Sequence, residues 1–438
     1  MNLRFPSASI LLILSFWVFI SCASKQEMAP RASSNIQPSG AVQTNSVWAQ
    51  QQPYVLLISL DGFRHDYLER FQPQHLSAFA KAGVRAASLI PVYPSKTFPN
   101  HYSIATGMYP DHHGLLGNVY YNTRLQKEYN TRNRETVEDG RFYGGTPIWV
   151  QASKAGMVTA SYFFVGTEAP VQGIQPTYWY PYDGKVSKQE RIDQTLDWLR
   201  LPPETRPHLI TLYFSDMDTT GHRYGPQADI QLEATLNELD DALGALFQGL
   251  DALELPIDVV IVSDHGMAAI SPEQLLPIEP WLNEEQYRLI DNGSMLSIHP
   301  LHQEDTEEIF QTLQSKSDHF TVYKTQEVPY FEEKPTNPDW GAIQLVPDAG
   351  FYFMHENGIA MRKNSGQDFF GFHGFPPTQK DMHGIFYAKG PLLATDLTLP
   401  SFKNIHIYPL LCKLLGLDIP ANIDGSITPL AKGLKHPN

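Results

Sequence analysis

The stretch that decides the fold is Tyr54-Val55-Leu56-Leu57-Ile58-Ser59-Leu60-Asp61-Gly62. The residues before the aspartate are almost all apolar and lack the alternation of a half-exposed strand. Such a continuous run is typical of a strand that is buried on both faces, as in a parallel sheet. The run therefore predicts a central strand with a carboxylate at its carboxyl end.

Three further apolar runs follow the same design, over residues 208–214, 257–262 and 384–388. Patterns of helical period lie between the runs, over residues 76–82, 188–199 and 229–250. Strands that alternate with helices indicate an α/β fold with a mostly parallel central sheet flanked by helices. Open sheets of this kind place their sites at the carboxyl ends of the strands.

Residues 270–375 differ in composition from the segments on either side. They are rich in Pro, Glu and Asn, with short strand-like pieces at residues 286–290, 320–324 and 343–346. We interpret them as a small α+β subdomain inserted into a catalytic domain that spans residues 53–432.

The N-terminus has the pattern of a targeting segment. Residues 1–4 carry one positive charge, and an apolar stretch follows at residues 10–20, which is too short to span a bilayer well. Residues 1–22 therefore predict a signal peptide, with plain secretion after cleavage near Ser21 or Ala23 as one interpretation. The alternative is a bacterial lipoprotein, because Phe19-Ile20-Ser21-Cys22 resembles a lipobox in which Cys22 is lipidated. Either way we expect an exported protein of a bacterium, in the periplasm or anchored to the outer membrane.

Residues 23–52 are rich in Ser, Gln, Asn, Ala and Pro, which predicts a disordered tether between anchor and domain. The chain has only two cysteines, and loss or lipidation of Cys22 would leave Cys412 alone in an apolar helical pattern. We expect Cys412 to be a small core residue, without a disulfide.

The net charge of −15 argues against a nucleic acid polymer as partner. It does not exclude a small anionic substrate, because bound metal ions can reverse the sign of the local field.

Polar residues with metal-binding or nucleophilic chemistry follow several of the apolar runs. They are Asp61, Thr97, Asp216 or Asp218, His222, Asp264, His265 and His383. Each one alone has an ordinary explanation, such as a turn, a helix cap or a core histidine. Together they would meet at one edge of the sheet, where carboxylates and imidazoles could hold two divalent ions, with zinc favoured by the nitrogen ligands. Asp218 and His222 also have the i, i+4 spacing that points two side chains the same way on a helix.

The segment around Thr97 resembles the nucleophile motif of the nucleotide pyrophosphatase/phosphodiesterase family, in the alkaline phosphatase superfamily. The motif is Val92-Tyr93-Pro94-Ser95-Lys96-Thr97-Phe98-Pro99-Asn100-His101-Tyr102-Ser103-Ile104-Ala105-Thr106-Gly107. Similarity continues through residues 108–118 and recurs at residues 216–226, 263–267 and 381–384. These blocks span roughly residues 54–415, and the resemblance implies an alkaline-phosphatase-like core.

The resemblance also implies two zinc sites. One zinc would bind Asp218, His222 and His383, with Asp218 preferred over Asp216 because it keeps the spacing of the family motif. The second would bind Asp61, Asp264, His265 and the hydroxyl of Thr97.

The implied reaction is hydrolysis of a phosphodiester or pyrophosphate bond of a nucleotide through a phospho-threonine at Thr97. Asn118 would donate to a phosphoryl oxygen, and Phe98 and Tyr213 would sandwich the nucleobase. Three alternatives stay open at this point. They are a phosphodiesterase on choline phosphodiesters or lysophospholipids, a phosphomonoesterase of the same superfamily, and a zinc-binding surface module without activity.

Overall fold

The computed structural model describes residues 42–278 and 285–435, which include the four apolar runs expected to be strands of the central sheet. The expected signal peptide and Cys22 lie outside the described residues, as does most of the expected tether. Within these ranges, no helix is both long and apolar enough to cross a membrane.

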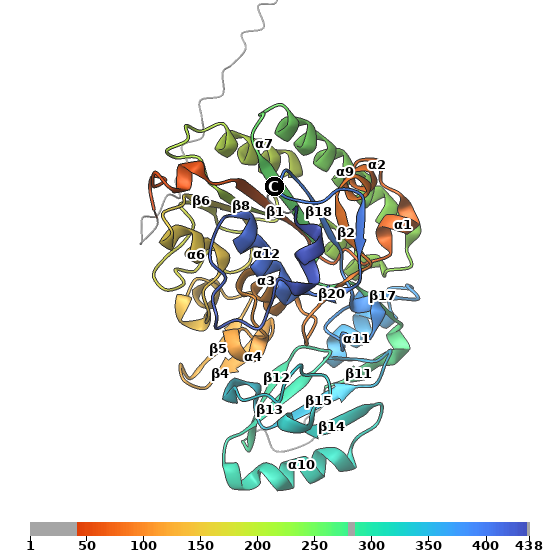
Figure 1. Ribbon diagram of the computed structural model, residues 1–438. Helices are drawn as coiled ribbons and strands as arrows, with labels where there is room; N and C mark the ends of the chain where they lie inside the picture. Colours follow the sequence, from red (N-terminus) through yellow and green to blue (C-terminus); the bar gives the residue numbers. More distant parts are fainter. Residues whose placement is uncertain (1–41, 279–284, 436–438) are drawn as a thin grey trace, which may run out of the picture. The chain divides into compact units, whose positions relative to one another are not determined.

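The central sheet contains eight strands in the order β19-β2-β18-β9-β1-β8-β6-β7 (Figure 1). Their bounds are β1 Tyr54–Leu60, β2 Val84–Ala86, β6 Thr159–Tyr162, β7 Tyr178–Tyr180, β8 Leu209–Phe214, β9 Ile257–Val262, β18 Phe386–Lys389 and β19 Leu397–Leu399. β1 pairs in parallel with both β8 and β9, whereas β18 runs antiparallel to β9 and β2. The prediction of a mostly parallel sheet is therefore confirmed.

Helices cover both faces of this sheet. Side chains of β1 enter two separate cores in alternation, with Val55 and Leu57 in one and Leu56 and Ile58 in the other. The first core includes residues of α3 Thr97–Thr106, α6 Ile148–Lys154 and α12 Ile407–Leu414, and the second includes residues of α2 Gln74–Ala82, α7 Lys188–Leu199 and α9 Asp229–Asp251. Burial on both faces is the reason that β1 is an unbroken apolar run. Cys412 is a buried core residue on α12, as expected.

A smaller sheet lies within residues 270–375. It is antiparallel, with the order β12-β13-β15-β14, and it shares a separate core with α10. The bounds are β12 Tyr287–Asp291, β13 Leu296–Pro300, α10 Thr306–Ser315, β14 Phe320–Lys324 and β15 Ile343–Pro347. Two short strand pairs join it to the main fold, β10 Ala268–Ile270 with β17 Phe370–Phe372 and β11 Leu275–Pro277 with β16 Tyr352–Met354. The helix α11, Glu356–Lys363, follows β16.

Shorter elements complete the described chain. They are α1 Tyr67–Phe71, β3 Leu89–Ile90, α4 Pro110–His113, β4 Val119–Asn122, β5 Lys127–Asn130, α5 Arg134–Val137, α8 Asp216–Tyr224 and β20 Phe402–Lys403.

The folded domain begins earlier than the expected boundary at residue 53. The Asn45 side chain is buried, donates to the carbonyls of Pro203 and Arg206 at 2.8 and 2.7 Å, and accepts from the Val158 amide at 2.7 Å. A turn of 3-10 helix follows at Ala49–Gln51. The last residues of the expected tether are thus part of the domain, because one asparagine satisfies three backbone groups there.

Candidate active site

Thr97 is the first residue of α3, so its hydroxyl lies at the amino end of a ten-residue helix. The loop before the helix is held by Asn100, whose side-chain amide donates to the carbonyls of Pro94 and Lys96 at 3.0 and 2.8 Å. The Asn100 carbonyl oxygen accepts from the Val92 amide at 2.8 Å. The positive end of the helix dipole at this point favours negative charge on or near Thr97.

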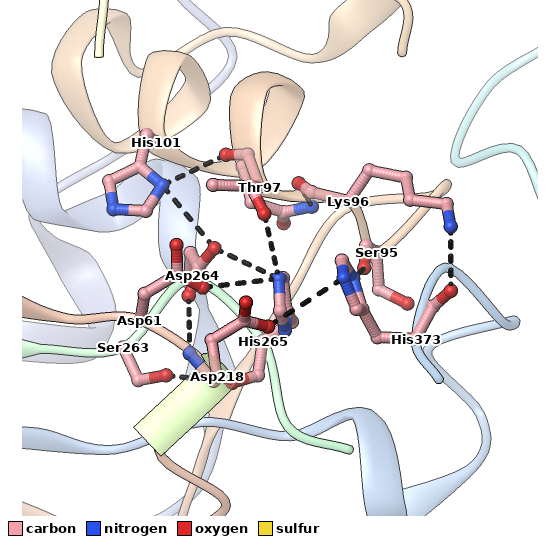
Figure 2. A network of polar contacts seen from close by, with 12 residues as sticks. Asp61, Ser95, Lys96, Thr97, His101, Asp218, Ser263, Asp264, His265 and His373 are labelled. Atoms are coloured by element: carbon pink, nitrogen blue, oxygen red, sulfur yellow. Dashed lines mark hydrogen bonds and ion pairs between the residues drawn. The ribbon is translucent and has the colours of Figure 1, made fainter. Parts of the chain in front are cut away.

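The first group of candidate ligands lies beside Thr97. It consists of Asp61, directly after β1, and of Asp264 and His265, shortly after β9. The Nε2 atom of His265 is 3.2 Å from the Thr97 hydroxyl, 3.5 Å from Asp61 Oδ1 and 3.1 Å from Asp264 Oδ2 (Figure 2). The structure thus brings together all four residues that were predicted for one zinc.

The second group consists of Asp218, His222 and His373. Asp218 and His222 lie one turn apart on α8, with 3.3 Å between Asp218 Oδ1 and His222 Nε2, and His373 Nε2 is 3.8 Å from the same oxygen. The rings of His373 and His265 stack at 3.6 Å between centroids, so the two groups adjoin.

A glycine allows the second group to lie beside the first. Gly62 has a φ of +65°, and a Cβ atom there would lie 2.7 Å from Cα of Asp218. The Asp218 amide donates to the Asp61 carbonyl at 3.0 Å. Asp61 and Gly62 therefore end β1, and the absence of a side chain at Gly62 leaves room for Asp218 near the start of α8.

The structure corrects the prediction of His383 as the third ligand of this group. His383 Nδ1 is 2.8 Å from the Ser88 hydroxyl, and His383 Nε2 is 2.9 Å from the Pro377 carbonyl, so both ring nitrogens are engaged elsewhere. His383 does reach the expected edge, because β18 is antiparallel and its amino end lies where the parallel strands end. His373 takes the predicted place, directly after β17. The sequence pattern that could have identified His373 is Phe370-Gly371-Phe372-His373-Gly374, in which a His-Gly pair follows a short apolar run. The apolar run at residues 257–262 is likewise followed, two residues later, by His265-Gly266.

Each of the three clustered histidines has its Nδ1 atom next to a backbone carbonyl. The partners are Gly371 for His222 at 2.8 Å, Gly266 for His265 at 2.9 Å and Ser95 for His373 at 2.9 Å. A carbonyl only accepts, so Nδ1 carries the proton and the lone pair is on Nε2. In all three residues Nε2 faces a carboxylate of the site, which is the arrangement that a metal ligand requires.

The carboxylates of the site have oxygens without a donor. Asp61 Oδ1, Asp218 Oδ1 and Asp264 Oδ2 are buried and have no hydrogen-bond partner among the described residues. Burial and the neighbouring carboxylates raise the pKa of Asp61 well above its usual value, and burial raises that of Asp264 to about 8. Burial acts to raise the pKa of Asp218 as well, but His222, His265 and Lys96 together outweigh it, and the net shift is downward. Three orphaned oxygens beside three Nε2 lone pairs fit two divalent cations, and the mixed oxygen and nitrogen set fits zinc.

One of the expected substrate residues, Tyr213, has different surroundings from those predicted. Tyr213 is buried, and its hydroxyl donates to Asp61 Oδ2 at 2.5 Å, so it orients a candidate ligand instead of presenting a ring face. Tyr182 packs beside Tyr213 at 6.2 Å between centroids and is 46% exposed. Asn118 accepts from the Phe98 amide at 3.1 Å through its carbonyl oxygen, which leaves its amide nitrogen as the donor.

Two buried residues that were not predicted, His101 and Lys96, lie close to the site, whereas Asp216, the alternative to Asp218 as a ligand, does not belong to it. His101 is buried on α3 and has Nδ1 3.3 Å from Asp264 Oδ2 and Nε2 2.7 Å from the Ser59 hydroxyl. Lys96 is buried, and its Nζ donates to the His373 carbonyl at 2.9 Å. Asp216, the rival of Asp218, pairs with Lys188 at 2.8 Å instead.

Known proteins share this sequence pattern. The family described as type I phosphodiesterase / nucleotide pyrophosphatase matches residues 55–376, which is most of the chain. The chain belongs to this family. It is 32% identical to mouse ectonucleotide pyrophosphatase/phosphodiesterase family member 1, over 88% of this chain and 43% of the relative. It therefore spans less than half the length of that relative.

Other relatives are closer in length. The chain is 30% identical to human ectonucleotide pyrophosphatase/phosphodiesterase family member 5, over 84% of this chain and 75% of the relative. Among solved structures, murine ectonucleotide pyrophosphatase/phosphodiesterase 5 in an inactive form with AMP has a TM-score of 0.79 and 29% identity, covering 88% of this chain and 100% of that one. These matches confirm the predicted family and its fold.

Proposed function

We propose that this protein is a two-zinc hydrolase that cleaves phosphodiester or pyrophosphate bonds of nucleotides through a phospho-threonine at Thr97. The observation that carries the proposal is the position of the Thr97 hydroxyl, at the amino end of α3 and 3.2 Å from His265 Nε2. Beside it lie two adjoining groups, each with carboxylate oxygens and imidazole nitrogens directed inward.

Asp61, Asp264, His265 and Thr97 would hold one zinc, and Asp218, His222 and His373 the other. Bound zinc would supply Lewis acidity, which lowers the pKa of the threonine hydroxyl and offsets negative charge on the substrate. His265 Nε2, 3.2 Å from the Thr97 hydroxyl, would be engaged as a ligand of the first zinc, so the metal would take the place of a general base.

The residues themselves have clear tasks. Thr97 attacks phosphorus in line with the leaving oxygen, and a water molecule later releases the phosphoryl group from Thr97. The amide nitrogen of Asn118 donates to an equatorial oxygen and offsets its charge in the transition state. Tyr213 and the three backbone carbonyls fix the orientation of the ligands, so that little reorganisation accompanies the reaction.

For the nucleobase, Phe98 and the half-exposed Tyr182 offer aromatic side chains near the site. This choice departs from the expected pair of Phe98 and Tyr213, because the Tyr213 ring is buried. A nucleotide substrate is supported by the murine relative, whose structure contains AMP and whose inactive form has alanine in place of a threonine.

The test is steady-state hydrolysis of a nucleoside p-nitrophenyl diester against a p-nitrophenyl monoester, with added zinc and with a chelator. We expect the diester to be cleaved with the higher kcat/KM, and chelation to abolish the activity reversibly. Preference for the monoester would favour a phosphomonoesterase. Hydrolysis of a choline phosphodiester but no nucleotide would favour a lipid headgroup as substrate, and no hydrolysis at all would leave a zinc-binding module.

We further propose that the protein is exported, with Cys22 as a lipid anchor, because an apolar stretch of signal-peptide length precedes this cysteine. The mature protein should begin at Cys22 and fractionate with the cell envelope. Cys22→Ser should release it or block its maturation. An intact N-terminus at Met1 in the cytoplasm would contradict export.

A further inference from the structure

The inserted subdomain contacts the main fold through the segment between β14 and β15, of which we call residues 328–337 the strap. The far end of the strap is fixed by Asp111 on α4. The Asp111 carboxylate accepts from the Thr336 amide and hydroxyl at 3.0 and 2.8 Å and from the Asn337 amide at 3.0 Å. Trp340, just after the strap, donates from Nε1 to the same carboxylate at 2.9 Å. A single side chain of the main fold thus holds the end of the strap in place.

The strap also contacts the nucleophile loop, by which we mean residues 92–96, which lead directly into α3. Glu332 Oε1 accepts from the Tyr93 amide at 3.1 Å. The Tyr93 ring is fully buried and packs against the rings of Tyr330 and Phe331, at 5.7 and 5.5 Å between centroids. Both the backbone and the ring of Tyr93 therefore depend on the strap.

Two side chains from different parts of the chain hold consecutive amides of the nucleophile loop. Asn100, on α3, accepts from the Val92 amide at 2.8 Å, and Glu332 accepts from the next amide, that of Tyr93. A buried amide without an acceptor is costly, so loss of either acceptor would favour another conformation of the loop. Because Thr97 lies only four residues beyond Tyr93, such a change would displace the nucleophile.

The carboxyl group of Glu332 lies in surroundings that disfavour its charge. Burial raises its pKa to about 7, against the opposing effects of Lys403 and of the hydrogen bonds from its own amide and from the Tyr93 amide. An acidic side chain in such a place is disfavoured unless donors compensate it. The Tyr93 amide is such a donor, and it belongs to the nucleophile loop.

We propose that Glu332 is a positioning residue, which holds the Tyr93 amide and thereby sets the place from which the Thr97 hydroxyl attacks. The inference rests on the proposed function. It adds a task for the inserted subdomain, namely to hold the nucleophile loop through the strap.

The strap lies outside the cleft next to the candidate ligands. This cleft of about 1440 Å³ is lined by Lys96, Asn118 and Asp218, among other residues. None of the described residues that line it belongs to the strap. Misplacement of a reacting atom by about 1 Å can slow an enzyme by on the order of 100-fold, even when its cause lies far from the chemistry. We therefore expect Glu332 to affect kcat and to leave KM nearly unchanged.

The first test measures steady-state hydrolysis of a nucleoside p-nitrophenyl diester by variants at two neighbouring positions of the strap. Glu332→Leu removes the acceptor, and we expect kcat per zinc-loaded molecule to fall about 10–100-fold, with KM close to that of the wild type. Glu332→Gln keeps an oxygen that can accept from the Tyr93 amide, so it should retain most of kcat. Glu333→Leu is the matched control, because the Glu333 side chain is 63% exposed and its Oε2 lies 4.0 Å from His112 Nε2. Its kcat should stay that of the wild type.

The zinc content and the thermal unfolding of each variant distinguish positioning from a purely structural role. If Glu332→Leu loses zinc or folded protein but keeps the wild-type kcat per zinc-loaded molecule, Glu332 only stabilises the fold and the inference is wrong. An equal loss of kcat in Glu332→Gln would also overturn it, because the acceptor would then be irrelevant. A wild type that does not cleave the diester would instead overturn the proposed function itself.

A second test asks whether the strap acts through Glu332. Asp111→Asn weakens the attachment of the strap to α4, and we expect kcat to fall about threefold to tenfold. In the Glu332→Leu background the same exchange should add little, because the strap no longer holds the Tyr93 amide. Losses of kcat that multiply in the double variant would show two independent effects and would contradict the inference.

Discussion

The two ends of β9 each have a buried aspartate with an orphaned oxygen, and they differ in what surrounds it. Near the start of the strand, Asp258 accepts from the Leu392 amide at 3.0 Å, and its Oδ2 has no hydrogen-bond partner in the described chain. Beyond the carboxyl end, Asp264 Oδ2 is equally without a donor, but His265 Nε2 and His101 Nδ1 lie 3.1 and 3.3 Å away. Burial raises the pKa of both carboxyls, to about 7 and about 8.

The difference teaches that an orphaned carboxylate oxygen is not by itself a sign of a metal. Asp258 belongs to no cluster of metal-ligating side chains in the parts of the chain that the structure describes, so protonation is its way to avoid a buried charge. Asp264 shares its surroundings with Asp61 and with His265, whose Nε2 lone pair faces inward, so a cation can compensate several groups at once.

The largest expected effect is the contrast between two variants, each of which removes the carboxylate charge at one end of β9. Asp264→Asn should lower kcat/KM by on the order of 10³-fold and reduce the bound zinc below two ions per chain, because a candidate ligand beside Thr97 is lost. Asp258→Asn should leave both quantities close to the wild type. Metal analysis and steady-state kinetics check the pair, and similar losses in both variants would erase the contrast.

A second pair of variants tests which histidine is the third ligand of the second group. His373→Ala should lower kcat/KM by more than about 100-fold and weaken one zinc, because Nε2 of this residue faces Asp218. His383→Ala should cost much less, since both of its ring nitrogens are engaged with Ser88 and Pro377. The reverse order of losses would restore His383 as the ligand.

Tyr213→Phe removes only a hydroxyl and tests whether the ring or the hydroxyl matters. We expect a loss of about 10–100-fold in zinc affinity or activity, because the donor to Asp61 Oδ2 disappears while the buried ring stays. The loss should be the same for substrates with and without a nucleobase. A loss confined to nucleotides would instead make Tyr213 a base-binding residue.

The smallest effect concerns stability at the other end of the strand. The pKa of Asp258 is raised to about 7, so between about pH 4 and pH 7 the unfolded chain loses this proton while the folded chain keeps it. The free energy of unfolding of the wild type therefore falls over this window relative to that of Asp258→Asn, by at most about 4 kcal/mol. Above about pH 7 this gap between the two proteins stays constant. Urea unfolding of both proteins at pH 4.5 and pH 8 checks this, and a gap that does not change with pH would contradict it.

Most of the fold could be predicted from sequence because its central strands are unbroken apolar runs. The expected limits of β1, β9 and α7 agree with the structure, since burial on both faces or one amphipathic stripe fixes the pattern. The tether was the exception. Asn45 gives no periodic signal, and its three backbone partners come from distant parts of the chain.

Apart from Thr97, Asp218 and His222, which lie in motifs that resemble those of the family, the site could be predicted only where a ligand follows a long run. Asp61, Asp264 and His265 do so, whereas His373 follows β17, a strand of only three residues. His383 stands before a conspicuous strand, but only the antiparallel direction of β18 and the contacts of its ring show where its nitrogens point. Tyr213 was assigned to the nucleobase because sequence cannot reveal that its hydroxyl contacts Asp61.

The most direct test of the central claim, a covalent intermediate on Thr97, is the stereochemical course at phosphorus. A nucleoside thiophosphate diester of known configuration would be hydrolysed by the zinc-loaded enzyme in oxygen-18 water, and the configuration of the product determined. Attack by Thr97 and then by water are two in-line displacements, each of which inverts phosphorus, so we predict net retention. Net inversion would show that water attacks the substrate directly, and Thr97 would then be at most a ligand of the metal.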